Sequence, residues 1–527
     1  MPERLFLDTL AKLDRQFVLT KYKECTPKIL VVTDGLSFNP ADGFGLTQFV
    51  STLATSTIHG MTPQVVTKVR TTGGFRFDDP TEGVLKSRYD VVFILGIYGA
   101  GTNPVSAAEK QAIGAFMQAG GGVFATGDHQ DLGASMSADL PRVRNMRHWT
   151  SGTPHVSNTN RISTNVSGAN EREDFDDQSD IIPQNLYPNF RTVAGNPAGV
   201  ARPGMAHPLL QLAPLPGVTN PVIEVFPDHP HEGECFVPTN LSTTFLLGSA
   251  NVDEWPAAPV GGRVSPEAVA YSMSHGSGFS SGPTGPKDAL VPRAFVAICA
   301  YDGQRANVGR VVTDATWHHF VNINLDGTGS GLLGLQSAPG VDGPALTRIR
   351  QYYRNIATWL MPKNTRRCLR FPHFLQELRH YPLFEEVVVP HVPIGPDPGP
   401  DPLPLVQLGK AVVDSLLLRE PAFVAETVLE DALQDAVGER AAAQLSGTPA
   451  RFGNLTPREL AFGALGAITN SVLATLETIK DPQEVSPHKT FDGPALEHAR
   501  KSTRRLIDWQ RAELRALDQL LENLPND

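Results

Sequence analysis

The fold can be inferred most directly from residues Ser106–His129, which read SAAEKQAIGAFMQAGGGVFATGDH. The first four residues form a capping box, because the serine hydroxyl and the glutamate carboxylate can each accept a hydrogen bond from a free amide at the helix start. We therefore expect a helix to about Ala119, ended by the glycines that follow. The apolar run Gly122–Thr126 then predicts a buried strand, which closes at Gly127–His129.

Earlier segments of the chain repeat this alternation. A helix is expected from about residue 46 to residue 58, and short strands are expected at Lys28–Thr33, Gln64–Val69 and Tyr89–Leu95. Strands that alternate with helices indicate right-handed crossovers. The fold class predicted for this part is therefore α/β, with a doubly wound, mainly parallel sheet.

A site is expected at the carboxyl edge of this sheet, because ligands of open α/β sheets bind beyond the carboxyl ends of the strands. Asp34, the loop 96–101 and the pair Asp128–His129 all leave strands at that edge. The loop reads GIYGAG, which matches neither a P-loop nor GxGxxG. We therefore expect a strand-to-helix turn there and no nucleotide cofactor.

The composition changes after residue 130 and returns to an α/β pattern near residue 294. Residues 130–292 are rich in Asn, Asp, Ser, Gly and Pro. Since structureless loops of this length are rare in compact domains, we interpret them as an insertion that caps the sheet. Ala294–Cys299 and Gly309–Asp314 are then expected core strands with a hairpin-like Asp302–Gly303 between them, and Pro344–Met361 is an expected helix. This α/β domain should span residues 28–390.

The two ends of the chain differ from this domain. Residues 1–27 read as an amphipathic helix without the apolar stretch of a signal peptide. Residues 391–405 are proline-rich and should form a semi-rigid linker. Residues 406–527 form a predicted helical domain, with helices at 406–418, 422–445, 457–479 and 494–524.

The last of these helices carries an apolar stripe. It consists of Leu506, Trp509, Leu514, Leu517 and Leu521. Such a stripe can pack inside its own bundle, or it can meet the same helix of another copy in a homo-oligomer.

Composition excludes several function classes. The chain has 527 residues, of which 41% are hydrophobic and 19% charged, as in globular proteins with more than one domain. A net charge of −10 argues against nucleic acid and anionic membranes as partners, and no run approaches a membrane span. Cys25, Cys235, Cys299 and Cys368 are scattered, which suits a reducing compartment. We expect a cytoplasmic protein with a small-molecule substrate.

Three separated segments carry residues of the kind that bind metal ions: Asp128–His129, Asp228–Glu234 (DHPHEGE) and Trp317–His319. Carboxylates and imidazoles suit Zn, Mn or Fe, and such an ion with one vacant position makes its bound water acidic. The candidate metal ligands are His129, His229, His231 and His318. The candidate general acids or bases, or groups that orient ligands, are Asp128, Glu232 and His319.

Other histidines and the cysteines have simpler interpretations. Isolated histidines are expected to cap helices or to be hydrogen-bonded, namely His148, His155, His207 and His275. A cysteine nucleophile is not expected, because the turn after the GVFAT strand contains neither Cys nor Ser. Cys235 and Cys299 fall inside or beside strands, where thiols are usually buried and inert.

The order of these segments resembles the class I glutamine amidotransferase-like superfamily, and most of all its ThuA-like branch, which is associated with trehalose utilisation. The resemblance rests on KILVVTDG (28–35), YDVVFILG (89–96), AGGGVFATGDH (119–129) and GRVVTDATWHH (309–319). It implies a flavodoxin-like sheet with Asp128 or His129 near the elbow of the amidotransferase nucleophile. It also implies that His318 or His319 occupies the position of the catalytic histidine. The elbow cysteine is absent, so glutamine hydrolysis by that mechanism is not implied.

Two hypotheses of function follow. The first is a metal-dependent hydrolase or related lyase that acts on a small polar substrate, a carbohydrate or an amide, between sheet and cap. The second is a non-catalytic binding or assembly protein that uses the α/β domain as a scaffold and oligomerises through its C-terminal helices.

Overall fold

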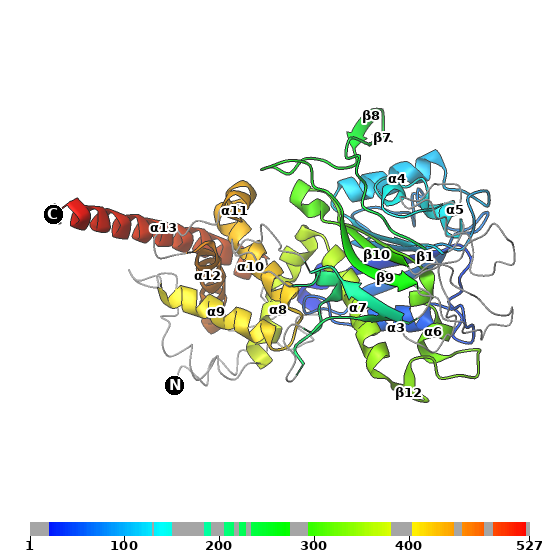
Figure 1. Ribbon diagram of the computed structural model, residues 1–527. Helices are drawn as coiled ribbons and strands as arrows, with labels where there is room; N and C mark the ends of the chain where they lie inside the picture. Colours follow the sequence, from blue (N-terminus) through cyan, green and yellow to red (C-terminus); the bar gives the residue numbers. More distant parts are fainter. Residues whose placement is uncertain are drawn as a thin grey trace.

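A computed structural model describes residues 20–128, 131–149, 184–190, 205–215, 221–227, 233–274, 293–380, 403–446, 456–478 and 488–522. In these residues the chain forms an α/β domain and a C-terminal helical region, which lie next to each other (Figure 1). None of the described helices is long and apolar enough to cross a membrane.

A nine-stranded mixed sheet forms the centre of the α/β domain. Its strands in spatial order are β2 (Gln64–Val69), β1 (Lys28–Thr33), β3 (Val91–Leu95), β4 (Gly122–Thr126), β11 (Val311–Asp314), β10 (Arg293–Tyr301), β9 (Glu267–Ser274), β5 (Gln184–Pro188) and β6 (Val225–Phe226). The first five are parallel to one another, which confirms the α/β class and a parallel sheet in this half.

The other four strands run antiparallel to their neighbours. The pairing of β10 with β11 confirms the hairpin-like connection expected between them, whereas the sequence did not predict the antiparallel strands β5, β6 and β9. β10 and β11 are joined by only a short connection, whereas parallel neighbours need a crossover of a dozen or more residues. Strands β5, β6 and β9 come from the stretch 130–292. The described parts of that stretch therefore extend the sheet, in addition to the hairpin of β7 (Thr244–Leu247) and β8 (Ala250–Asp253).

Helix α4 (Ala107–Gln118) confirms the expected capping box. The Ser106 hydroxyl accepts a hydrogen bond from the Glu109 amide, and the Glu109 carboxylate accepts one from the Ser106 amide. Gly120, with φ of 95°, follows the end of the helix in a left-handed conformation that favours glycine. Glu109 also forms a buried ion pair with Arg70 at the end of β2.

Helices cover both faces of the parallel half of the sheet (Figure 1). Helices α3 (Thr47–Thr55) and α7 (Pro344–Leu360) share a hydrophobic core with Ile29 and Val31 of β1. The alternate residues Leu30 and Val32 belong to a second core, with α4 and α5 (Ala134–Ser137). This alternation is the period of two that a strand buried on both faces requires.

Short elements complete the domain. They are η1 (Lys23–Cys25), η2 (Val143–Asn145), η3 (Pro208–Leu210), η4 (Gly303–Ala306), η5 (Trp317–His319), α6 (Asn322–Asp326), β12 (Gln336–Ala338) and β13 (Val341–Asp342). The His207 side chain accepts a hydrogen bond from the Leu209 amide at the start of η3, as expected of a capping histidine. Residues 1–19 of the expected N-terminal helix lie outside the described residues.

The helical region contains more helices than the sequence predicted. They are α8 (Lys363–His380), α9 (Leu403–Leu417), α10 (Ala422–Val437), α11 (Glu439–Ser446), α12 (Pro457–Thr478), the π-helical turn η8 (His488–Asp492) and α13 (Gly493–Glu522). The single helix expected over 422–445 is wrong, because Gly438 breaks it with φ of 86°. The expected linker over 391–405 is too long at its end, because α9 accommodates Pro404 in its first turn.

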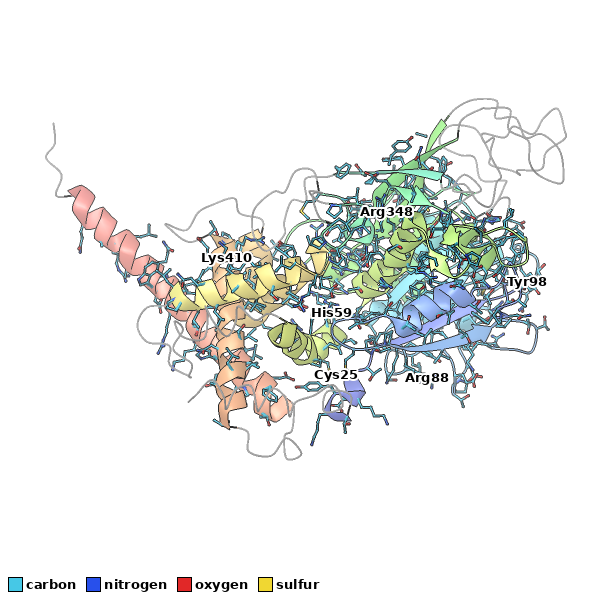
Figure 2. The ribbon with its side chains drawn as sticks, turned by 90° about the horizontal axis from the view of Figure 1, so that it is seen from below. Cys25, His59, Arg88, Tyr98, Arg348 and Lys410 are labelled. Carbon is cyan, nitrogen blue, oxygen red and sulfur yellow. A yellow bond between two sulfur atoms is a disulfide. The ribbon has the colours of Figure 1, made fainter. Side chains whose placement is uncertain are left out.

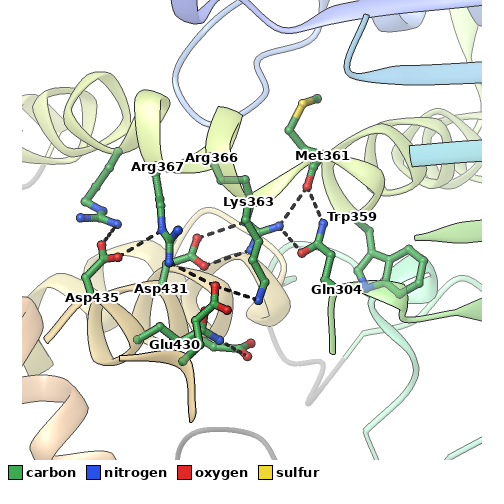
Figure 3. A network of polar contacts seen from close by, with 12 residues as sticks. Gln304, Trp359, Met361, Lys363, Arg366, Arg367, Glu430, Asp431 and Asp435 are labelled. Atoms are coloured by element: carbon green, nitrogen blue, oxygen red, sulfur yellow. Dashed lines mark hydrogen bonds and ion pairs between the residues drawn. The ribbon is translucent and has the colours of Figure 1, made fainter. Parts of the chain in front are cut away.

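Helix α8 joins the two parts of the molecule (Figure 3). Arg366 makes a bidentate ion pair with Asp431 of α10 and also donates to Gln304 of the α/β domain. On the same helix Cys368 forms a disulfide with Cys25, whereas Cys235 and Cys299 are buried and form no disulfide with a described residue. Cys25 and His59 lie where the two parts meet (Figure 2). The disulfide differs from the reduced cysteines that the sequence suggested.

Candidate active site

The candidate site lies where the loops after β4 and β11 meet. These strands are parallel neighbours with Thr126 opposite Asp314. Beyond the ladder, the Trp317 amide donates to the Gly127 carbonyl at 2.9 Å, which joins the two loops. Asp128 and His318, which are almost 200 positions apart in the sequence, therefore come together at the carboxyl edge.

Asp128 and His318 form the central pair of the site. The Asp128 Oδ2 and His318 Nε2 atoms are 3.6 Å apart. The Thr316 hydroxyl donates to Asp128 Oδ1 at 2.7 Å and accepts from the His318 amide at 3.0 Å, so one threonine orients both residues. His318 Nδ1 lies 3.1 Å from Oδ1 of Asn324 on α6. Because an amide oxygen only accepts, this contact places the imidazole proton on Nδ1 and turns Nε2 toward Asp128.

Aromatic side chains close one side of this pair. Trp317 stacks on the His318 ring, with ring centroids 4.2 Å apart. Phe44, from the loop before α3, lies edge-on to both rings. His318 is only 9% exposed and Asp128 only 1%, so the pair lies largely out of bulk water. A carboxylate and an imidazole in such a place interact more strongly than they would at the surface.

His319 belongs to a different group, although it is the next residue. Its Nδ1 lies 2.7 Å from Asp314 Oδ1, and the Tyr352 hydroxyl of α7 donates to Asp314 Oδ2 at 2.7 Å. Phe226 stacks on the His319 ring at 3.8 Å. The ring is fully buried, and its Nε2 has no hydrogen-bond partner among the described residues. Burial, together with Asp314, raises the pKa of Tyr352 well above its usual value. The structure thus places His319 in the core between sheet and α7.

The remaining predicted site residues cannot be placed. His129, His229, His231 and Glu232 lie outside the described residues. The described residues on either side of the stretch 228–232 both contact the loop after β11. Phe226 stacks on His319, and Gly233 lies so close to Ala315 that a side chain there would collide with its carbonyl oxygen. Within the described chain, no group of three or more His, Cys, Asp or Glu residues is arranged to hold a metal ion.

Asp34 directly follows β1 and lies at the same edge of the sheet, but it contacts the loop after β3. Its Oδ1 accepts hydrogen bonds from the amides of Ile97 and Tyr98, at 2.6 and 3.2 Å. Burial raises the pKa of Asp34 to about 6. The carboxylate therefore fixes the loop after β3, the tight turn expected there, and none of its described contacts links it to Asp128.

Sequence reasoning missed several residues that organise the site. They are Asp314, Thr316, Asn324 and Tyr352. Thr316 carried a recognisable signal, since a threonine directly before a helical turn often caps it. Asn324 and Tyr352 carried none, because their contacts depend on how α6 and α7 pack.

Comparison with known proteins identifies no relative: no family model, no curated protein and no solved structure matches the chain.

Proposed function

We propose that this protein is a hydrolase or related lyase that acts on a small polar substrate, a carbohydrate or an amide, at the carboxyl edge of the sheet. The observation that carries the proposal is the Asp128–His318 pair, in which each partner is oriented by a second side chain. A carboxylate held in this way can accept and donate a proton at a bound substrate, and an imidazole held in this way can bind a metal ion through Nε2.

The proposal includes a divalent transition metal, Zn, Mn or Fe. Metal-bound histidines usually donate their other ring N–H to an oxygen, as His318 Nδ1 does toward Asn324. Asp128 Oδ2 lies 3.6 Å from His318 Nε2, close enough to accept a proton from water bound to an ion on that nitrogen. When bound, such an ion makes water acidic enough to attack at neutral pH.

The further ligands that we propose are His129, His229 and His231, with Glu232 and His319 as acid, base or orienting groups. Phe226 and Gly233 contact the loop after β11, which supports a role for the stretch between them. His319 is suited to an orienting role, because Asp314, itself bonded by Tyr352, fixes the His319 ring.

We also propose the finer fold and family assignment, a flavodoxin-like sheet of the class I glutamine amidotransferase-like type, ThuA-like branch. The spatial order β2-β1-β3-β4-β11 supports it, because flavodoxin-like sheets have the order 2-1-3-4-5. A cytoplasmic location and the absence of nucleic-acid and membrane partners stay predictions from composition.

Metal analysis tests the proposed function. Purified protein should contain about one transition metal ion per chain, and His318→Ala should lose it. Addition of the ion at 100 times its Kd should stabilise the metal-free protein by about 2.7 kcal/mol. His391→Ala, a histidine of the proline-rich stretch, is the control and should retain the ion. A metal-free protein that no ion stabilises would refute the metal part of the proposal.

A second candidate function, assembly through α13, is favoured by the projecting end of that helix and its exposed leucine. Its first half packs against the helical region, with Leu506 buried and Trp509 partly buried. Its last turns project beyond the other described helices (Figure 1), and Leu514 is 40% exposed. The side chains of Leu517 and Leu521 lie outside the description. If α13 pairs with a second copy, Leu514→Glu should halve the mass measured by light scattering; an unchanged mass would exclude this role.

A further inference from the structure

Arg147 is a buried cation below the candidate site. It is 1% exposed, and its guanidinium stacks on Trp149 at 4.6 Å. It forms no ion pair with any carboxylate in the described part of the chain, and burial lowers its pKa. A buried charge without a direct counterion costs several kcal/mol. Such a residue calls for an explanation beyond packing.

Its hydrogen bonds all end on backbone carbonyls. Nη2 donates to the Asp128 oxygen at 2.8 Å and to the Ala315 oxygen at 2.7 Å. Nε donates to the Asp314 and Ala315 oxygens at 3.2 Å, and Nη1 donates to the oxygen of His148 at 2.7 Å. One planar side chain thereby spans the exits of both β4 and β11.

The segment that carries Arg147 is itself fixed over β11. The Thr313 hydroxyl donates to the Met146 carbonyl at 3.0 Å, and Arg147 forms a backbone bridge with Cys235. Gly127 and Gly233 leave room for the guanidinium, since a side chain at either position would approach its nitrogens. The guanidinium of Arg147 is therefore tightly enclosed, and it contacts both strand exits.

We infer that Arg147 is the positioning residue of the Asp128–His318 pair, an inference that rests on the proposed function. One of its acceptors is the carbonyl of Asp128 itself. Another is the carbonyl of Ala315, directly before Thr316, which orients both members of the pair. Without the guanidinium these carbonyls lose their shared donor, and the two loops are held only by the Trp317–Gly127 and Thr316–Asp128 hydrogen bonds among the described contacts. The turn that carries His318 can then shift, so that Asn324 no longer fixes the His318 ring.

Arg310 supplies a matched control. It is also buried, also stacks on a tryptophan (Trp359, 4.5 Å) and also donates to a backbone carbonyl, at 2.7 Å. It differs in that its Nε also pairs with Asp302 at 2.7 Å. However, it lies at the amino end of β11, away from the site. Arg147→Met and Arg310→Met should both lower the melting temperature, so a change seen only in the first reports on the site.

The test records the imidazole tautomers of ¹⁵N-histidine-labelled protein by NMR, with His318→Ala to assign the signal. The native protein and Arg310→Met should show His318 as the Nδ1–H tautomer, and Arg147→Met should show a mixture of tautomers. Metal affinity of Arg147→Met should fall at least tenfold. Arg147→Lys, which keeps the charge but not the planar fork, should fold and show a partial loss.

An unchanged His318 signal in both Arg147 variants would overturn the inference and leave Arg147 a structural residue. If Arg147→Met does not fold, Arg147→Lys alone decides between these outcomes. The tautomer measurement needs no metal. A native protein that binds no ion would therefore count against the proposed metal site, whereas an unchanged tautomer would count against Arg147.

Discussion

Two Asp–His pairs stand side by side at the end of β11, and their surroundings differ. Asp128 and His318 lie at the edge of the sheet, 3.6 Å apart, beside an aromatic wall. Asp314 and His319 lie in the core, 2.7 Å apart, with Tyr352 as a third member. Consecutive histidines on the 3₁₀ turn η5 thus enter different environments. The side of one short turn from which an imidazole projects therefore decides its surroundings. On one side the ring lies at the edge of the sheet, where it can contact a substrate, and on the other it is packed in the core.

Replacing the aspartate of each pair should distinguish the two pairs most clearly, through the free energy of unfolding. Asp314→Ala removes the partner of two buried groups, His319 Nδ1 and the Tyr352 hydroxyl, so the free energy of unfolding should fall by about 3–5 kcal/mol. Asp128→Ala should cost at most about 2 kcal/mol, because its described partners are one hydroxyl and one imidazole at the edge. Urea denaturation of both variants measures the difference. Equal losses would show that the pairs are equivalent.

The Cys25–Cys368 disulfide provides the next test. Replacement of both Cys25 and Cys368 by serine opens a cross-link over 343 positions and should lower the free energy of unfolding by about 2–4 kcal/mol. Because this disulfide lies at the junction with the helical region, neither Asp–His pair should change. Thiol counting and melting curves with and without reductant measure the effect, with Cys235→Ser as the single-thiol control. A lost His318 NMR signal would show that the site depends on this junction.

One hydroxyl contacts each pair: Tyr352 bonds Asp314 and Thr316 bonds Asp128. Removing the first should mainly lower stability, and removing the second should mainly weaken metal binding. Tyr352→Phe deletes a hydrogen bond to a buried carboxylate and should cost about 1.5–3 kcal/mol of stability, with the metal content unchanged. Thr316→Val deletes the bonds to Asp128 and to the His318 amide, and should cost about 1 kcal/mol but weaken metal binding. Thr316→Ser, which keeps the hydroxyl, should restore binding. If Tyr352→Phe alone lost the metal, the core pair would be the functional one.

Much of the scaffold could be predicted from local sequence. The capping box at Ser106 and the apolar runs of β1, β3 and β4 are written in a few adjacent residues, so helix α4 and the parallel strands were expected. The meeting of Asp128 and His318 followed from the rule that parallel strands end at one edge. The antiparallel pairing of β10 with β11 was indicated by the hairpin-like Asp302–Gly303 between them. The directions of β5, β6 and β9 were not predicted, because strand-like composition alone carries no direction.

Other features depend on distant packing. Nothing near His318 and His319 indicates which ring turns inward, because the choice is made by Tyr352 and Phe226. Arg147 looks like any surface arginine until the carbonyls of Asp128 and Ala315 surround it. The Cys25–Cys368 pairing joins residues that have no local spacing signal. These are the positions where three-dimensional contacts override the sequence pattern.

The smallest expected effect concerns a histidine that belongs to neither pair. Burial lowers the pKa of His373, on α8, to about 4 from its ordinary 6.5. The unfolded chain therefore binds the proton first, so stability is full above pH 6.5 and falls as the pH drops toward 4. At pH 5.5 the loss should be about 1 kcal/mol, and His373→Gln should flatten this slope. Urea denaturation between pH 5 and 7 measures it. If the slope survived in His373→Gln, another buried histidine, such as His59, would carry it.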